Sequence, residues 1–335
     1  MRIKAGLRSI CAMLLVVALA IGLCGCGKED EDEKKLPSSE GFTNDVLMRI
    51  GGTEVSYAEG NIYLLSMREE VEALYGSEIW DLKFTREERP YSELMKERLL
   101  EKLIYIKLVC HMADEFDVKL EADDILNVHE YTQQYLSGIT ESTAKKYGIT
   151  EELVRSIYND NVLAEKTYQT ITLNADISEI TEAEVLRAKF YYIFLTRSYE
   201  DADGNRTAYS EEDMRALWTK AESYRAAAAE SKDFYNYAKG VTAAGTIEIT
   251  VGRADLPVKS RNAAFALHTG EISEIVEEED GLYIFYCVDE KDKAATQAAE
   301  EARIEELSRA YFDSLYEKWK ANIKVEVNEA LWDAM

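Results

Sequence analysis

The pattern of apolar residues changes twice along this chain, and these changes constrain the fold more than any other feature. Apolar residues at helical spacing fill the chain from about residue 56 to 184, and the same spacing returns from about 291 to 320. Between these segments, Phe190–Leu195 and Leu282–Val288 are unbroken aromatic and aliphatic runs, which are typical of buried strands. Helices, then a small α/β unit, then another helix predict an α+β fold in which one domain is inserted into another.

Capping residues and periodicity predict where the single elements begin. Ser56-x-x-Glu59 and Ser210-x-x-Asp213 are N-terminal capping signals, and Thr181-x-x-Glu184 is expected to open a further short helix. A polar loop is expected at 199–209. Helices are expected at about 56–75, 92–115, 121–137, 150–171, 210–230, 234–239 and 291–320. Short strands are expected at Val46–Ile50, Thr53–Val55 and Ile323–Val327.

The N-terminal residues follow the pattern of a secretory signal peptide. Basic residues precede an apolar run from Ile10 to Leu23, which is too short and too close to the terminus for an ordinary membrane span. The run ends in Leu23-Cys24-Gly25-Cys26, which resembles a bacterial lipobox, so residues 1–25 are predicted to be removed and Cys26 to carry lipid. A plain signal peptide with an incidental cysteine is the alternative. Residues 26–44 are predicted to form an acidic, solvated tether.

Charge and residue counts limit the partners and the chemistry. The chain has 39 Lys+Arg and 64 Asp+Glu, a net charge of −25, which speaks against nucleic acid and against broad adhesion to anionic lipid headgroups. Three histidines, His111, His129 and His268, leave few candidates for a metal site, and no metal or cofactor is expected. Cys110 and Cys287 could pair in an oxidising compartment, but two buried free thiols suit their apolar surroundings better.

One acidic segment has part of a calcium-loop pattern. Carboxylate or amide oxygens stand at positions 1, 3, 5 and 12 of the stretch from Asp201 to Glu212. Arg206 occupies the position at which such a loop needs glycine. A turn leading to the Ser210 cap is therefore the preferred interpretation, and calcium binding is the alternative.

A resemblance to a known family rests on the segment after the middle of the chain. Ala264-Phe-Ala-Leu-His-Thr-Gly-Glu-Ile-Ser273, followed by Gly281-Leu-Tyr-Ile284, resembles the C-terminal half of a parvulin-type (PpiC-like) peptidyl-prolyl isomerase domain. The resemblance covers about residues 183–289. Together with the lipobox and the flanking helices, it resembles the PrsA- and SurA-like extracytoplasmic foldases. It implies that residues 45–182 and 290–335 form one helical chaperone module, with Val46–Ile50 and Ile323–Val327 as adjoining strands.

The resemblance also implies a site in which this chain departs from the family. Parvulins use two inward-facing histidines, a Cys or Asp, a Thr/Ser pair and a Met–Phe proline pocket, which stabilise a twisted amide. Tyr283 stands at the second histidine, and either Phe190 or Tyr192 stands at the first. The Cys/Asp position falls near Val241-Thr242. The remaining candidate substrate-binding residues are Leu256, Ser260, Phe265, Glu278 and Asp280. Plain strand packing is the preferred interpretation of both tyrosines, because aromatic residues suit strands, and a role as site residues is the alternative.

These patterns lead to one functional hypothesis with two alternatives. The chain is expected to be a membrane-anchored, extracytoplasmic chaperone or foldase on the outer side of a bacterial cell membrane, binding unfolded secreted polypeptides. Its isomerase-like domain is expected to have weak or no activity, because both histidines are replaced. The alternatives are an active isomerase and a non-catalytic binding or scaffold lipoprotein. The expected partners are unfolded chains and, through Cys26, the membrane; no nucleic acid is expected, and a homodimer is left open.

Overall fold

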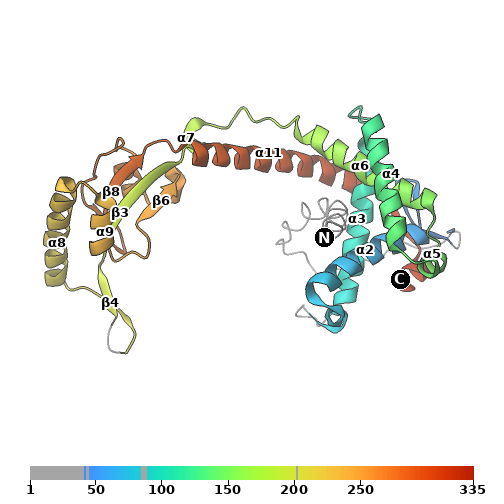
Figure 1. Ribbon diagram of the computed structural model, residues 1–335, viewed down its shortest axis with the longest axis horizontal. Coiled ribbons are helices and arrows are strands. Elements are labelled where there is room, and N and C mark those ends of the chain that lie inside the picture. Colours follow the sequence, from blue (N-terminus) through green and yellow to red (C-terminus); the bar gives the residue numbers. More distant parts are fainter. Residues whose placement is uncertain (1–40, 43–44, 84–88, 201–202) are drawn as a thin grey trace. The chain divides into compact units, whose positions relative to one another are not determined.

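The computed structural model describes residues 41–42, 45–83, 89–200 and 203–335 (Figure 1). Contacts divide the chain into unit 1, which runs up to Ala175 and resumes at Ala310–Met335, and unit 2, Asp176–Arg309. In sequence, unit 2 therefore stands between the two segments of unit 1, and the predicted α+β class with an inserted domain is confirmed. The signal segment and Cys26 lie outside the described residues. No helix in the described part of the chain is long and apolar enough to cross a membrane.

Unit 1 joins the two ends of the chain in one small sheet. The strand order is β2-β1-β9, where β1 is Val46–Ile50, β2 is Thr53–Ser56 and β9 is Val325–Val327. Strand β1 pairs antiparallel with β9, with Met48 opposite Val327, so the predicted adjacency of the first and last strands is confirmed. The helices of this unit are α2 (Tyr57–Tyr75), η1 (Ser77–Asp81), α3 (Tyr91–Met112), α4 (Ala122–Gly138), α5 (Glu141–Tyr147), α6 (Glu151–Thr172), α12 (Glu329–Asp333) and the last part of α11 (Lys293–Asn322).

Helix α3 is the centre of unit 1. It contacts α2, α6 and β1, and every residue from Lys102 to Val109 is buried. Two caps begin helices of this unit: at the predicted cap, the Ser56 Oγ accepts a hydrogen bond from the Glu59 N–H at 3.0 Å, and Thr150 caps α6 in the same way. Helix α3 ends three residues before the predicted end, and the short helix α5 was not predicted from the sequence.

Unit 2 is a four-stranded antiparallel sheet with helices on both faces. The strand order is β6-β3-β8-β7, and Figure 1 labels β6, β3 and β8. One face packs Ile193, Leu195 and Ile284 against helices α8 and α9. The other face packs Phe190 and Phe285 with α10. The bounds are β3 Ala188–Thr196, α8 Glu211–Glu230, α9 Phe234–Val241, β6 Glu248–Val251, η2 Arg253–Asp255, α10 Val258–Ala264, β7 Val276–Glu277 and β8 Gly281–Asp289.

The start of unit 2 differs from the prediction in two places. The expected polar loop contains a hairpin of β4 (Ser198–Glu200) and β5 (Arg206–Ala208). The short helix α7 (Glu182–Val185) forms as predicted, but Thr181 makes no side-chain capping bond, and Glu184 pairs instead with Arg303 at 2.8 Å. This ion pair, and a hydrogen bond from the Arg187 N–H to the Thr296 Oγ1, place the first turns of α11 in unit 2.

Both described cysteines are free thiols. Cys110 is half-buried in unit 1, where its Sγ–H donates to the Asp160 carbonyl oxygen at 3.1 Å. Cys287 is buried in unit 2. Burial raises the thiol pKa to about 12 for Cys110 and to about 11 for Cys287, so both are protonated and poorly nucleophilic at neutral pH. The interpretation as two free thiols is confirmed.

A buried lysine in α3 gives unit 1 a pH-dependent stability. The Lys102 ammonium lies 5.6 Å from the centre of the Tyr63 ring, and burial lowers its pKa to about 8, although the Glu70 charge acts in the opposite direction. In the unfolded chain, Lys102 keeps its proton up to pH about 10.5. Below pH 8 the folded state must bury the charged ammonium, so this group lowers the free energy of unfolding. The loss of stability fades as the pH rises from 8 to 10.5. Lys102→Met is therefore expected to raise the free energy of unfolding by about 2 kcal/mol at pH 7. The gain should shrink towards pH 10.5 in urea titrations, and a gain independent of pH would contradict this account.

Candidate functional site

One face of the sheet in unit 2 carries a continuous row of aromatic rings. Alternate residues of a strand point to the same face, so Phe190, Tyr192 and Phe194 of β3 share it with Tyr283 and Phe285 of β8. Phe194 is paired with Tyr283 and Tyr192 with Phe285, and the Tyr192 and Tyr283 rings are stacked with centroids 6.1 Å apart. We call these five residues the aromatic face.

The two ends of the aromatic face differ in burial. Phe190 and Phe285 are each 1% exposed and belong to the core, whereas Tyr192, Phe194 and Tyr283 are half-buried. The sequence left open whether Phe190 or Tyr192 stands at the family's first histidine. The structure brings Tyr192 next to Tyr283 at the surface, while Phe190 packs inside against Phe265, with ring centroids 5.4 Å apart. Tyr192 is therefore the residue that a ligand could contact.

The two tyrosine hydroxyl groups have different surroundings. The Tyr283 hydroxyl donates to the Asp280 Oδ2 at 2.7 Å. Burial raises the pKa of Tyr283 well above its usual range, and the hydrogen bond to Asp280 and the neighbouring acidic charges act in the same direction. Burial also raises the pKa of Tyr192, whose hydroxyl has no hydrogen-bond partner among the described residues. Both phenols therefore stay protonated at neutral pH, and Tyr192 has its proton available for a ligand.

The other predicted site residues lie beside the aromatic face, where their contacts join α10 to the sheet. The Ser260 N–H and Oγ–H both donate to the Glu278 Oε1, at 2.9 and 2.8 Å, and the Ser260 residue is 2% exposed. Leu256 and Phe265 are half-buried in the same cluster, and the Arg253 guanidinium lies 5.0 Å from the centre of the Phe265 ring. The Ser260–Glu278 pair thus ties α10 to the turn before β8 instead of forming a proline pocket.

No histidine stands at the aromatic face. His268 is exposed in a turn of unit 2, where its Nδ1 lies 2.9 Å from the Glu290 Oε2, and the other two histidines belong to unit 1. The Thr242 hydroxyl, near the uncertain Cys/Asp position, accepts a hydrogen bond from the Phe194 N–H at 2.9 Å. The polar groups available to a bound amide are therefore phenols and carboxylates.

Sequence reasoning missed two members of the aromatic face. Phe194 lies two residues after Tyr192, and Phe285 lies two residues after Tyr283. The twofold repeat of a strand puts them on the same face as the tyrosines, so this periodicity could have found both. The calcium-loop pattern lies partly outside the described residues, since 201–202 are not described. No group of three or more metal-binding side chains occurs in the described ranges.

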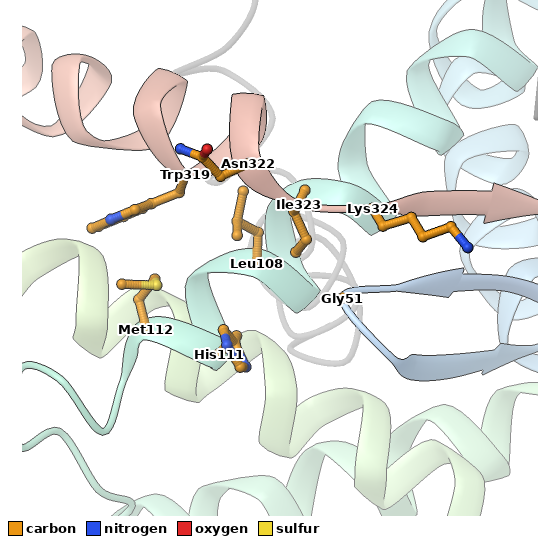
Figure 2. Close-up of a pocket in the computed structure, with 8 residues that line it drawn as sticks. All are labelled: Gly51, Leu108, His111, Met112, Trp319, Asn322, Ile323 and Lys324. Atoms are coloured by element: carbon orange, nitrogen blue, oxygen red, sulfur yellow. The ribbon is translucent and has the colours of Figure 1, made fainter.

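Unit 1 has a cavity of about 310 Å³ where α3, α11 and the β1–β2 turn meet (Figure 2). Its apolar wall includes Leu108, Met112 and Trp319. The Lys324 side chain extends away from Trp319, and its ammonium pairs with Glu326 at 2.7 Å. Gly51 has a φ of +56°, which favours glycine, and a Cβ there would lie 2.9 Å from the Ile323 Cδ1 and displace the end of that side chain. The cavity can accept an apolar side chain.

A second cavity of unit 1, about 540 Å³, lies along α4 and α6. It is lined by Leu120, Ile125, Leu126, Val128, His129, Arg155 and Asn159. Ile125 and Leu126 are 57% and 63% exposed, unusual for large aliphatic side chains that lie next to each other. No separate sequence signal marks this surface, because both residues are compatible with a buried helix stripe.

Comparison with known proteins returned matches among solved structures. No protein-family model matches the chain, and no curated protein matches it significantly. A PpiC-type peptidyl-prolyl cis-trans isomerase domain is 20% identical, with 32% of this chain and 94% of that one covered and a TM-score of 0.27. The PrsA foldase of Lactococcus lactis is 14% identical, with 85% and 95% covered and a TM-score of 0.34. A SurA-like chaperone structure from Campylobacter jejuni is 10% identical, with 85% and 99% covered and a TM-score of 0.29.

These structures, a PpiC-type domain and PrsA- and SurA-like proteins, are of the same kinds as the families that the sequence resembles. The domain match covers about a third of the chain, and the two foldase matches cover most of it. At these identities and TM-scores the likeness assigns no activity, client or location to this chain. Its chemistry has to be read from its own residues.

Proposed function

We propose that this chain is an extracytoplasmic protein-folding factor that binds unfolded secreted polypeptides and is anchored to the membrane by lipid on Cys26. The observation that carries the proposal is the aromatic face, where Tyr192, Phe194 and Tyr283 present apolar rings on a rigid sheet. The exposed Ile125 and Leu126 in unit 1 support it. An extended client chain can bury apolar side chains on such surfaces, and each buried large side chain contributes roughly 1.5–3 kcal/mol before the entropic cost of ordering the chain.

The isomerase-like activity is proposed to be weak or absent. Rotation about an X–Pro bond crosses a barrier of roughly 18–20 kcal/mol, and an enzyme lowers it with donors aimed at the twisted carbonyl. Here the Tyr283 proton is held by Asp280, and the Ser260 hydroxyl is held by Glu278. Tyr192 is left as a single weak donor. The alternatives are an active isomerase that uses Tyr192 and a non-catalytic scaffold lipoprotein.

Removing the two half-buried tyrosine rings tests whether clients bind to the aromatic face. Tyr192→Ala/Tyr283→Ala in the full chain is expected to weaken binding of an unfolded client by about tenfold or more, because truncating an aromatic anchor costs roughly 1–2 kcal/mol. Binding is measured by fluorescence anisotropy, and suppression of client aggregation is followed by light scattering. Tyr235→Ala is the matched control, since this exposed ring packs on Tyr191, on the opposite face of the sheet. Equal losses in both variants would argue against the aromatic face.

The same preparations distinguish the alternatives. In a protease-coupled proline isomerisation assay, the wild-type chain is expected to accelerate the reaction little, and the tyrosine variants should behave alike. Robust acceleration that is abolished by Tyr192→Phe or Tyr283→Phe would establish an active isomerase. Tight binding of a small molecule in a thermal-shift screen, without suppression of aggregation, would favour the scaffold lipoprotein.

A further inference from the structure

The aromatic face has an uneven charge. The end of β7 and the turn into β8 read Glu277-Glu-Glu-Asp280, and Asp280 is fixed at the Tyr283 end of the face by the hydrogen bond from the tyrosine hydroxyl. Asp280 accepts that bond through Oδ2, which leaves Oδ1 to interact with a ligand. The acidic charges of Asp280 and Glu278 also contribute to the raised pKa of Tyr283, so their field reaches the ring.

Few cations offset these carboxylates. Arg197 lies 3.8 Å from the Glu277 carboxylate, and the Lys259 ammonium donates to the Glu277 carbonyl oxygen at 3.0 Å. Among the described residues, no lysine or arginine lies within 4.0 Å of the carboxylates of Glu278, Glu279 or Asp280. The other end of the ring row is different, because the Arg253 guanidinium lies over Phe265 there. Glu278, Glu279 and Asp280 therefore place negative charge, without an ion-pair partner in the described part of the chain, at the tyrosine-rich end of the face.

We propose that this end of the face selects client segments in which a lysine or arginine stands close to an apolar residue or proline. The cationic group would lie against the rings of Tyr192, Phe194 or Tyr283 and close to the free oxygen of Asp280, while the neighbouring apolar side chain covers the rest of the face. A cation on an aromatic ring gains roughly 0.5–1 kcal/mol at an exposed site, and a nearby carboxylate adds to this. Acidic segments are repelled by the same turn. This inference rests on the proposed function and names its substrate class.

Matched peptides test this charge preference. Fluorescein-labelled peptides share one Phe-Pro pair and differ only in flanking residues, which are Arg, Gln or Glu. With the full chain at low salt, the Arg peptide is expected to bind about tenfold more tightly than the Gln peptide, and the Glu peptide more weakly than both. The preference should decrease as salt is added, because exposed charges are screened.

Removing two charges from the turn tests whether the preference comes from it. Asp280→Asn keeps an acceptor for the Tyr283 hydroxyl, and combined with Glu279→Gln it is expected to reduce the Arg preference to about twofold. Glu222→Gln removes the same charge from exposed α8, which covers the opposite face of the sheet, and should leave the preference unchanged.

The outcomes separate this inference from the proposed function. If all three peptides bind equally and all lose binding in Tyr192→Ala/Tyr283→Ala, the charge preference is overturned while the proposed function stands. If the preference survives Asp280→Asn/Glu279→Gln, it does not come from this turn, and the inference is overturned. If no peptide binds and the chain does not suppress aggregation, both the inference and the proposed function are overturned.

Discussion

Lys107→Met is expected to lower the free energy of unfolding of unit 1 by about 3–5 kcal/mol, the usual cost of removing one partner from a buried ion pair. The Lys107 ammonium lies 2.7 Å from the Glu59 Oε1 and 2.6 Å from the Asp160 Oδ2, so it joins α2, α3 and α6. The Lys107 and Glu59 side chains are each 7% exposed. Replacing the lysine leaves two carboxylates facing each other with no cation between them.

The pKa directions explain why this cluster depends on its cation. Burial opposes the charge of Lys107, but the attraction of Glu59 and Asp160 outweighs it, and the net pKa of Lys107 is raised. Burial raises the pKa of Glu59 despite the attraction of Lys107. One cation cannot offset the negative charge of two carboxylates. The cost of burying a charge therefore remains at Glu59, which is the more buried of the two. The folded state therefore takes up a proton on Glu59 more readily than the unfolded chain, and this group favours folding more as the pH falls towards 4.5.

Urea unfolding at pH 7 and pH 5 checks this expectation. Trp218 is the one tryptophan of unit 2 in a chain with four, so Trp218→Phe gives a background in which fluorescence reports on unit 1. The loss caused by Lys107→Met should be smaller at pH 5, because protonation relieves the unpaired Glu59. Glu59→Gln/Lys107→Met should recover about 2 kcal/mol of the loss.

A matched control makes the same substitution at an exposed ion pair. Lys320 lies 2.7 Å from the Glu101 Oε2, and the two side chains are 35% and 46% exposed. Lys320→Met is expected to cost less than about 1 kcal/mol, because water screens an exposed pair. Equal losses at Lys107 and Lys320 would contradict the role given to burial.

Gly281→Ala is expected to destabilise unit 2 by about 2–4 kcal/mol, as overpacking at a closely approached position does. Gly281 is buried opposite Thr196 where β8 begins, and a Cβ there would lie 2.2 Å from the Leu195 carbonyl oxygen and 2.6 Å from the Phe194 Cε2. Strand β3 cannot yield easily at this point, because on its other side the Phe194 N–H donates to the Thr242 Oγ1 at 2.9 Å and the Phe194 carbonyl oxygen accepts from the Ala243 N–H at 2.8 Å. The methyl group must therefore push β8, and with it Tyr283, out of register.

The control for this prediction is a glycine with space around it. A Cβ at Gly245 would meet no heavy atom within 4 Å, and the residue has no left-handed φ, so Gly245→Ala is expected to be neutral or to stabilise by up to about 1 kcal/mol. Unfolding of unit 2 is followed by Trp218 fluorescence in a background in which the three tryptophans of unit 1 are replaced by phenylalanine, and client binding is followed by anisotropy. If Gly281→Ala retains both stability and client binding, the close approach of β8 to β3 does not hold Tyr283 in place.

Local signals account for much of the fold that could be predicted. The caps at Ser56 and Ser210 begin helices as expected, because a capping side chain and the N–H groups that it satisfies lie within three residues of each other. The buried strands β3 and β8 were visible as apolar runs. The hairpin between β4 and β5 and the helix α5 were missed, since short polar elements carry weak local patterns.

The candidate site shows the limit of the same reasoning. Strand alternation places Phe190 and Tyr192 on one face, but only the pairing of β3 with β8 decides that Tyr192 lies beside Tyr283 while Phe190 is buried. The bond between Ser260 and Glu278 joins residues that are 18 positions apart. Such pairs follow from sheet register and helix docking, which no short window of sequence contains.

By itself, the sequence determined the order of the main helices and strands and the absence of histidine at the expected positions. These properties depend on residue identity and on neighbours a few positions away. Only the tertiary structure decided that Tyr192 lies beside Tyr283 at the surface, which carboxylate holds Tyr283, and that Glu59, Lys107 and Asp160 share one buried site. Those outcomes depend on packing between segments far apart in the chain, where burial and partner geometry set the energy of each charged or polar group.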